Sequence, residues 1–226
     1  MKKKSVVVLF LTFILIATNV TMVMAKDNGK KKQEESKGII LVDPGHGGID
    51  GGAKSKDGTI EKEINLSISK KLKKSLEAEG YTVYLTREDD SEISKKKVED
   101  LDARCKMKVD TKCDVFISIH QNKFSNANCF GAQVWYASNE KSSKMANLIQ
   151  NSIIESVGDG NKRLAKPAQN QYRILRDGYD GACVIVECGF LSNYQEEQKL
   201  KTDEHQDKIV NGIKNGVNSY FIDKDK

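Results

Sequence analysis

Short apolar runs that alternate with amphipathic stretches are the feature that most limits how this chain can fold. The runs are rich in β-branched and aromatic residues, as buried strands are, and they occupy residues 38–43, 81–86, 115–119, 131–136 and 182–186. Apolar residues recur at helical spacing over 61–79, 141–157 and a final stretch after residue 205, and a strongly charged helix is expected over 93–109. Strands joined by helical crossovers predict a single α/β domain, with a mostly parallel, twisted central sheet and helices on both faces.

Polar residues of chemical interest follow three of the predicted strands. Asp43 to His46, His120 and Glu187 each lie at or just beyond the end of an apolar run. Ligands of open parallel sheets bind beyond the carboxyl ends of the strands, so these side chains can meet at one edge. The third histidine, His205, lies among acidic residues at the start of a helix and is interpreted as solvated. The polar stretch 158–181 is expected to be a surface loop, with a short strand at Tyr172–Leu175.

Two histidines at equivalent strand ends, with carboxylates nearby, suggest a metal site. Catalytic zinc takes three protein ligands and leaves a fourth position for water. His46 and His120 therefore need a third ligand, and the pattern alone leaves five carboxylates open: Asp43, Asp50, Glu61, Glu63 and Glu187. Zn²⁺ is favoured by the ligand types, although other divalent metals accept the same set.

Five short segments make these assignments more specific. They are Val42–Gly48, Glu61–Leu66, Leu85–Arg87, Phe116–Asn122 and Val186–Asn193. In this order they resemble the motifs of the zinc-dependent N-acetylmuramoyl-L-alanine amidases of the amidase-3 family, and the resemblance spans nearly the whole domain.

The resemblance implies a role for each of four residues. His46, Glu61 and His120 would hold zinc, with their ligating atoms within about 4 Å of one another because each zinc bond is roughly 2.0 to 2.2 Å long. Glu187 would be the general base, which takes a proton from the attacking water and passes it to the leaving amine. The expected reaction is hydrolysis of the amide between muramic acid lactate and L-alanine in peptidoglycan. Asn122 and Arg87 are left outside the catalytic set.

Some features depart from the family pattern. Val109-Asp110 stands where members usually carry Ala-Asn, and Cys188 follows Glu187 where an aliphatic residue is more common. A thiol nucleophile would lack a histidine to activate it. The 66 residues between His120 and Glu187 leave no room for the cleft-plugging insertion of regulated members, which predicts an open site. A catalytic domain without wall-binding repeats resembles the small amidases that act on spore cortex before the muramic δ-lactam forms.

The amino-terminal residues have the pattern of an export signal. Three lysines precede an uncharged, apolar stretch, and Val23-Met24-Ala25 suits cleavage before Lys26. Residues 1–25 are therefore predicted to be a signal peptide, 26–37 a polar tether and 38–226 the catalytic domain, in a secreted protein. An uncleaved membrane anchor is the alternative, because roughly 20 apolar residues can span a bilayer.

Charge excludes one class of partner. Removal of residues 1–25 would leave 34 basic and 32 acidic residues, a net charge of +2 in place of +5. The charges are interspersed, without the basic, aromatic-studded stripe that tracks nucleic acid. Peptidoglycan is the expected partner, and a protein that activates or tethers the enzyme is left open. The alternatives are a zinc peptidase that cuts within the peptide stem, and an inert wall-binding protein.

Overall fold

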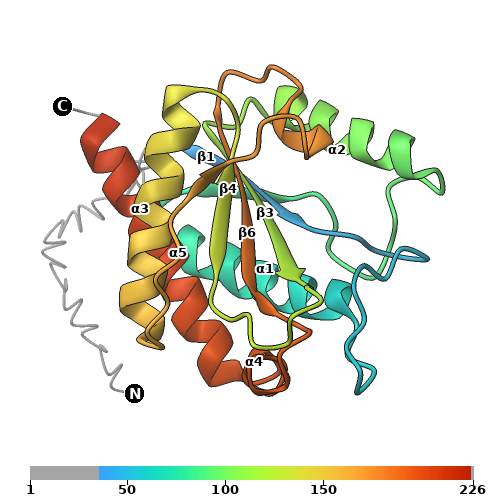
Figure 1. Ribbon diagram of the computed structural model, residues 1–226. Helices are drawn as coiled ribbons and strands as arrows, with labels where there is room; N and C mark the ends of the chain where they lie inside the picture. The colour runs from blue at the N-terminus through green and yellow to red at the C-terminus, as the bar shows by residue number, and fades with distance from the viewer. Residues whose placement is uncertain (1–35, 225–226) are drawn as a thin grey trace, which may run out of the picture. The chain divides into compact units, whose positions relative to one another are not determined.

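The computed structural model describes residues 36–224, and Figure 1 shows its elements. The strands are β1 (Ile39–Pro44), β2 (Thr82–Leu85), β3 (Val115–Asn122), β4 (Gln133–Tyr136), β5 (Lys166–Pro167) and β6 (Ala182–Phe190). The helices are α1 (Glu61–Ala78), α2 (Lys97–Thr111), α3 (Glu140–Val157), a 3₁₀ turn η1 (Arg173–Leu175), α4 (Tyr194–Leu200) and α5 (Asp203–Lys224). Among these residues, no helix is long and apolar enough to cross a membrane. The predicted signal peptide and most of the predicted tether lie outside the described residues.

One six-stranded sheet organises the domain, in the order β2-β1-β3-β6-β4-β5. β1, β2, β3 and β6 are mutually parallel, and β4 runs antiparallel to β6. The expected mostly parallel α/β sheet is therefore confirmed. β1, β3 and β6 lie side by side at its centre, so that the ends of the three chemically interesting strands are neighbours.

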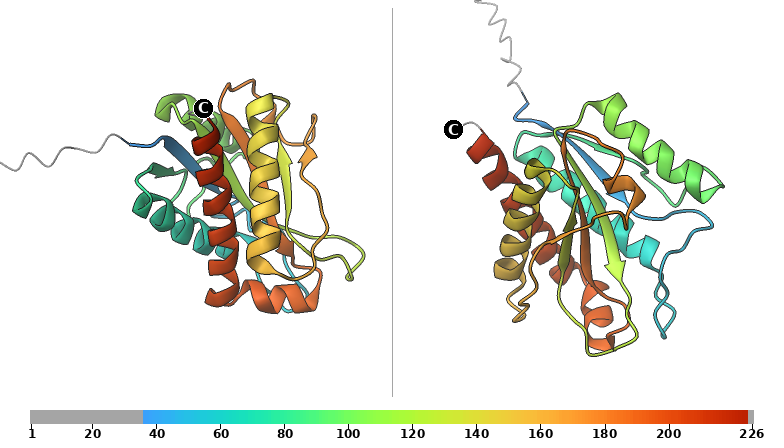
Figure 2. Two further views of the ribbon diagram at one scale, coloured as in Figure 1. Left: turned by 90° about the vertical axis from the view of Figure 1, so that its left-hand side faces the viewer. Right: turned by 45° about the horizontal axis from the view of Figure 1, so that its top comes forward.

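Both faces of the sheet are covered, which explains why its central strands are apolar without alternation. Helices α1, α3 and α5 pack on one face, and α2 with the segment around η1 packs on the other (Figures 1 and 2). All nine residues of β6 are buried. Strands buried on both sides read as continuous hydrophobic runs.

Two glycines let α5 lie close to α3. A Cβ atom at Gly212 would come within 2.6 Å of the Ile153 Cα atom, and one at Gly216 within 2.6 Å of the Ile149 Cα atom. The two helices run side by side in the left panel of Figure 2. Near the end of α5, Phe221 lies against Gly38 at the start of β1.

Three local expectations differ from the structure. The charged helix begins at Lys97 rather than at residue 93, because the Asp100 carboxylate accepts hydrogen bonds from the amides of Ile93 and Ser94 and holds that segment outside the helix. The strand expected at Tyr172–Leu175 is wrong: residues 173–175 form η1, where the buried Lys108 ammonium donates to the Ile174 carbonyl. The short helix α4 was not anticipated.

Candidate metal centre

The predicted residues meet at the carboxyl edge of the central strands. β1 leads into His46, β3 carries His120, and β6 carries Glu187 directly beside His120 in the strand register. Glu61 arrives from a different element, as the first residue of α1. Sheet topology therefore brings together side chains that are up to 141 positions apart along the chain.

The three predicted ligands form one compact group. A ligating atom from each of His46, Glu61 and His120 lies within 4.8 Å of the other two, slightly wider than the roughly 4 Å that zinc bond lengths suggest. Glu61 Oε1 lies 3.2 Å from His46 Nε2 and 2.9 Å from His120 Nδ1. Two imidazole nitrogens around one carboxylate oxygen are a donor set that suits zinc. The residues present thus fit the expected metal.

Hydrogen bonds fix the Glu61 carboxylate in place. Oε2 accepts from the Ala53 amide (2.7 Å), and Oε1 accepts from the Gln121 amide (3.0 Å). Burial acts to raise the pKa of Glu61, but its hydrogen bonds with His120 and His46 lower that pKa overall. The side chain is therefore an anion, which is the form that binds a cation.

Asp50 supports His46 from the opposite side of the ring. Its Oδ2 atom lies 3.0 Å from His46 Nδ1, while Nε2 faces Glu61. A carboxylate on the outer nitrogen of a ligating histidine fixes the tautomer and the ring orientation. Asp50, one of the five carboxylates that the sequence left open, thus lies behind the predicted ligand His46 rather than in the group that could hold a metal.

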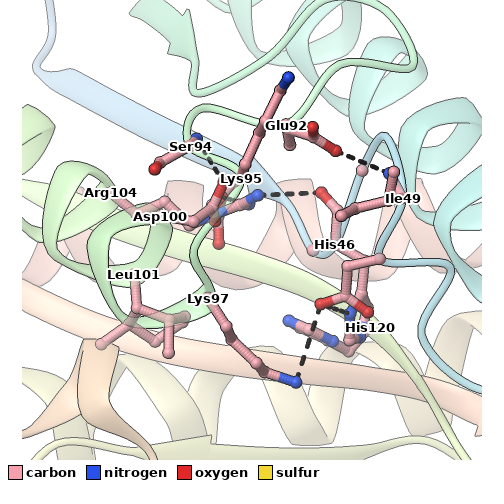
Figure 3. A pocket seen from close by; sticks show the side chains of 15 residues that line it. His46, Ile49, Glu92, Ser94, Lys95, Lys97, Asp100, Leu101, Arg104 and His120 are labelled. Carbon is pink, nitrogen blue, oxygen red and sulfur yellow. Dashed lines mark hydrogen bonds and ion pairs between the residues drawn. The ribbon is translucent and has the colours of Figure 1, made fainter.

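The backbone that carries His46 is unusual. His46 has a φ angle of 63°, in the left-handed region that non-glycine residues seldom adopt. Two buried arginines hold this segment through consecutive carbonyls. Arg104 donates to Pro44 (3.0 Å) and to His46 (2.9 Å), and Arg87 donates to Pro44 (3.0 Å) and to Gly45 (3.1 Å). Figure 3 shows the Arg104 contact with His46.

Arg104 also pairs with Asp43, another of the carboxylates left open. Their contact is 2.6 Å long, and their side chains are 3% and 1% exposed. Asp43 accepts further hydrogen bonds from the hydroxyls of Thr86 and Ser118, both 2.6 Å. Burial acts to raise the pKa of Asp43, but Arg104 and the two hydroxyls lower it overall. Asp43 is a structural anion beneath the site.

Glu187 differs from these carboxylates because, among residues 36–224, it makes no close ion pair. Its Oε2 atom is buried and has no hydrogen-bond partner among the described residues. Burial raises the pKa of Glu187 to about 7, although His120 acts in the opposite direction. A carboxyl group that titrates near neutral pH is suited to accept and return a proton. Burial also raises the pKa of the neighbouring Cys188, so that its thiol stays protonated and is a poor nucleophile.

The absence of a side chain at Gly45 leaves space for the His120 ring. A Cβ atom at this position would overlap the His120 ring. The sequence pattern indicated neither Asp50 as a group that supports His46 nor Arg104 as part of the site. Arg87 was considered because it belongs to the Leu85–Arg87 segment, and the structure places it against the ligand loop.

Comparisons with known proteins relate this chain to one family of amidases. Residues 40–219 match the N-acetylmuramoyl-L-alanine amidase family known as amidase-3. The chain is 33% identical over 195 residues to a germination-specific N-acetylmuramoyl-L-alanine amidase of Bacillus subtilis, a match that covers 82% of this chain and 81% of the relative. It is 34% identical over 198 residues to the probable cell wall amidase LytH of Staphylococcus aureus, covering 86% of this chain and 62% of that relative.

A solved structure shares the fold. The CwlD amidase of Clostridioides difficile, determined in complex with the GerS lipoprotein, superposes with a TM-score of 0.77 at 36% identity, over 81% of this chain and 98% of that chain. The extent of the match at this identity, together with the His-Glu-His group and Glu187 at the same sheet edge, establishes that the chain belongs to the amidase-3 family of N-acetylmuramoyl-L-alanine amidases.

Proposed function

We propose that this enzyme hydrolyses the amide between the lactyl group of muramic acid and L-alanine in peptidoglycan, with zinc held by His46, Glu61 and His120 and with Glu187 as the general base. One observation carries the proposal. The three predicted ligand atoms lie within 4.8 Å of one another, and Glu187 is the direct register neighbour of His120. Glu187 also has a buried oxygen without a hydrogen-bond partner in the described part of the chain.

The metal would supply the electrophilic part of the chemistry: zinc polarises a carbonyl and lowers the pKa of water toward neutrality. The protein's own residues supply the rest. Glu61, fixed by two backbone amides, keeps a negative charge between the two histidines. Asp50 holds the ring of His46 in the orientation that presents Nε2. The arginine contacts keep the strained ligand segment in one conformation.

Glu187 would transfer the proton. Its carboxylate accepts a proton from the attacking water and then donates it to the nitrogen of L-alanine as the carbon–nitrogen bond breaks. In the metal-free site, burial raises the pKa of Glu187 to about 7, and this upward direction favours a group that both accepts and returns a proton. Arg87 and Arg104 are occupied by backbone carbonyls and carboxylates, so neither is assigned a part in proton transfer.

The enzyme would act outside the cytoplasmic membrane, where peptidoglycan lies. The lysine-led apolar segment at the amino terminus and the cell wall amidase relatives support export. The relatedness to a germination-specific amidase supports spore cortex as one substrate, with cleavage that precedes formation of the muramic δ-lactam. A lipoprotein partner, as in the complex of the C. difficile relative, is a further part of the proposal.

Mass spectrometry of digested peptidoglycan tests the bond that is cut. Purified protein with added zinc is incubated with purified sacculi, and the soluble fragments are sequenced. The expected products are glycan strands without peptide and stems with a free L-alanine amine. A new amine at a later stem residue would instead identify a peptidase, and intact sacculi would identify an inert wall-binding protein.

A second digestion separates the two wall substrates. Cortex isolated from spores of a strain that lacks δ-lactam is compared with vegetative sacculi of the same strain. Faster release of stems from cortex supports the germination role, and equal rates support a general wall amidase.

A further inference from the structure

The candidate metal centre adjoins a cavity. Some charged side chains of its wall are paired with other groups of the protein, and others are not. This cavity has a volume of about 290 Å³ and includes His46 and His120 in its wall. On one side it is formed by the segment that follows β1, and on the other by residues 92–104, which comprise the segment before α2 and the first turns of α2 (Figure 3). His46 and His120 line this cavity, whereas Glu61 and Glu187 do not, so the cavity adjoins the site on the side of the two histidines.

The carboxylates of the cavity wall are already paired. Glu92, Asp50 and Asp100 each have a close partner within the protein. These partners are the Ile49 amide for Glu92 (2.7 Å), the His46 ring for Asp50 (3.0 Å) and the Arg104 guanidinium for Asp100 (2.5 Å). Arg104 is occupied as well, because it also binds Asp43. None of these groups is free to meet a charged substrate.

The two lysines of the wall are less constrained. Lys97 makes one long ion pair, with 3.7 Å between its Nζ atom and Asp50 Oδ2, and its side chain is 73% exposed. Within residues 36–224, Lys95 has no hydrogen bond or ion pair at all. Figure 3 shows the Lys97 side chain extending toward the ligand histidines. The charge that this cavity can offer to a ligand is therefore positive.

We propose that Lys97 binds a carboxylate of the peptide stem and so makes the enzyme selective for stems whose second residue carries a free α-carboxylate. This inference rests on the proposed function. The second residue follows L-alanine and is joined onward through its side-chain carboxyl, so its α-carboxylate is either free or amidated. No other stem carboxylate is closer to the scissile bond.

The reach of the side chain fits that carboxylate. Lys97 Nζ lies 3.7 Å from Asp50 Oδ2, which lies 3.0 Å from the ring of the ligand His46. Two extended residues span about 7 Å. A stem that runs from the metal past His46 and along this cavity would bring its second α-carboxylate to the region of the ammonium. The weak contact with Asp50 is easily exchanged for a substrate carboxylate.

The test compares two disaccharide–peptide substrates that differ only at this group. One carries the free α-carboxylate and the other the α-amide, and kcat and KM are measured for each with the zinc-loaded protein. The unmodified enzyme is expected to prefer the free carboxylate by about 3- to 10-fold in kcat/KM, the range between an exposed ion pair and a charge-assisted hydrogen bond. The two substrates should differ in KM and have similar kcat values, because the contact with Lys97 is made equally in the ground state and the transition state.

Three variants assign the preference to Lys97. Lys97→Met should bring the ratio of the two kcat/KM values close to one, and Lys97→Glu should reverse it. Lys96→Met is the matched control, since Lys96 pairs with Glu99 on the exposed surface (2.8 Å), does not line the cavity and should leave the ratio unchanged.

The outcomes separate the two proposals. Equal cleavage of both substrates by the unmodified enzyme would overturn the role of Lys97 while leaving the amidase activity intact. A loss for Lys97→Met that is equal on both substrates would also overturn it, because Lys97 would then act only through Asp50 on His46. Cleavage of neither substrate would show that the proposed function itself is wrong, and the inference would fall with it.

Discussion

Replacing Arg104 with methionine tests whether the buried ion pair beneath the metal centre holds the domain together. Arg104 and Asp43 are almost fully buried and lie 2.6 Å apart. Methionine has a similar length and an apolar end, but within residues 36–224 it leaves the Asp43 charge with only the hydroxyls of Thr86 and Ser118 as hydrogen-bond partners. It also removes the donors to the Pro44 and His46 carbonyls.

The expected cost is about 3–5 kcal/mol in the free energy of unfolding, the range for removal of one partner from a buried pair. For a domain of this size, that corresponds to a fall in Tm of roughly 6 to 20 °C. The assay is urea unfolding of the chelator-treated protein, so that differences in metal binding do not contribute.

A double variant identifies the cause of the loss. Asp43→Asn combined with Arg104→Met removes both charges and should be more stable than Arg104→Met alone, because the uncompensated buried anion is gone. A loss below about 1 kcal/mol for Arg104→Met would refute the reasoning. So would a double variant whose loss equals the sum of the two single losses, since independent sites add.

Three further predictions concern the site and the packing behind it. Glu187→Gln should keep its zinc, measured by atomic absorption, while turnover falls by roughly 10² to 10⁴. His120→Ala should instead lose zinc and activity together. If Glu187→Gln loses its zinc, Glu187 is a ligand rather than the general base. Gly45→Ala should weaken zinc binding because the added methyl group overlaps the His120 ring; an unchanged zinc dissociation constant contradicts this. Gly216→Ala should destabilise the fold by about 1–3 kcal/mol in urea unfolding, since its Cβ meets the Ile149 Cα at 2.6 Å; a gain of up to about 1 kcal/mol would mean that helix propensity outweighs the packing clash.

The central strands could be predicted from the sequence because burial alone determines their residue pattern. β1, β3 and β6 are buried on both faces, and that burial requires the uninterrupted apolar runs from which the strands were predicted. The placement of His46, His120 and Glu187 at one edge follows from parallel topology. The choice of Glu61 over the other carboxylates came from the family resemblance, because nothing in the spacing separates Glu61 from Glu63.

Tertiary contacts determine the features that could not be predicted from the sequence. Arg104 lies in a charged helix, where an arginine is normally solvated, and its partner carbonyl on His46 is 58 positions away. The start of α2 depends on a carboxylate that turns back onto preceding amides. Residues 173–175 form a 3₁₀ turn rather than a strand, in contact with the buried Lys108. Each of these features depends on a partner that is invisible to a local pattern.

The contact of Phe221 with Gly38 has a practical consequence for handling the enzyme. It brings the end of α5 next to the start of β1, whereas His46, a predicted metal ligand, follows the opposite end of that strand. Six residues of strand separate the two levels by roughly 20 Å. A bead, a surface or an appended wall-targeting module coupled near residue 36 or residue 224 would therefore leave the cleft facing away from the point of attachment, free to meet an insoluble substrate.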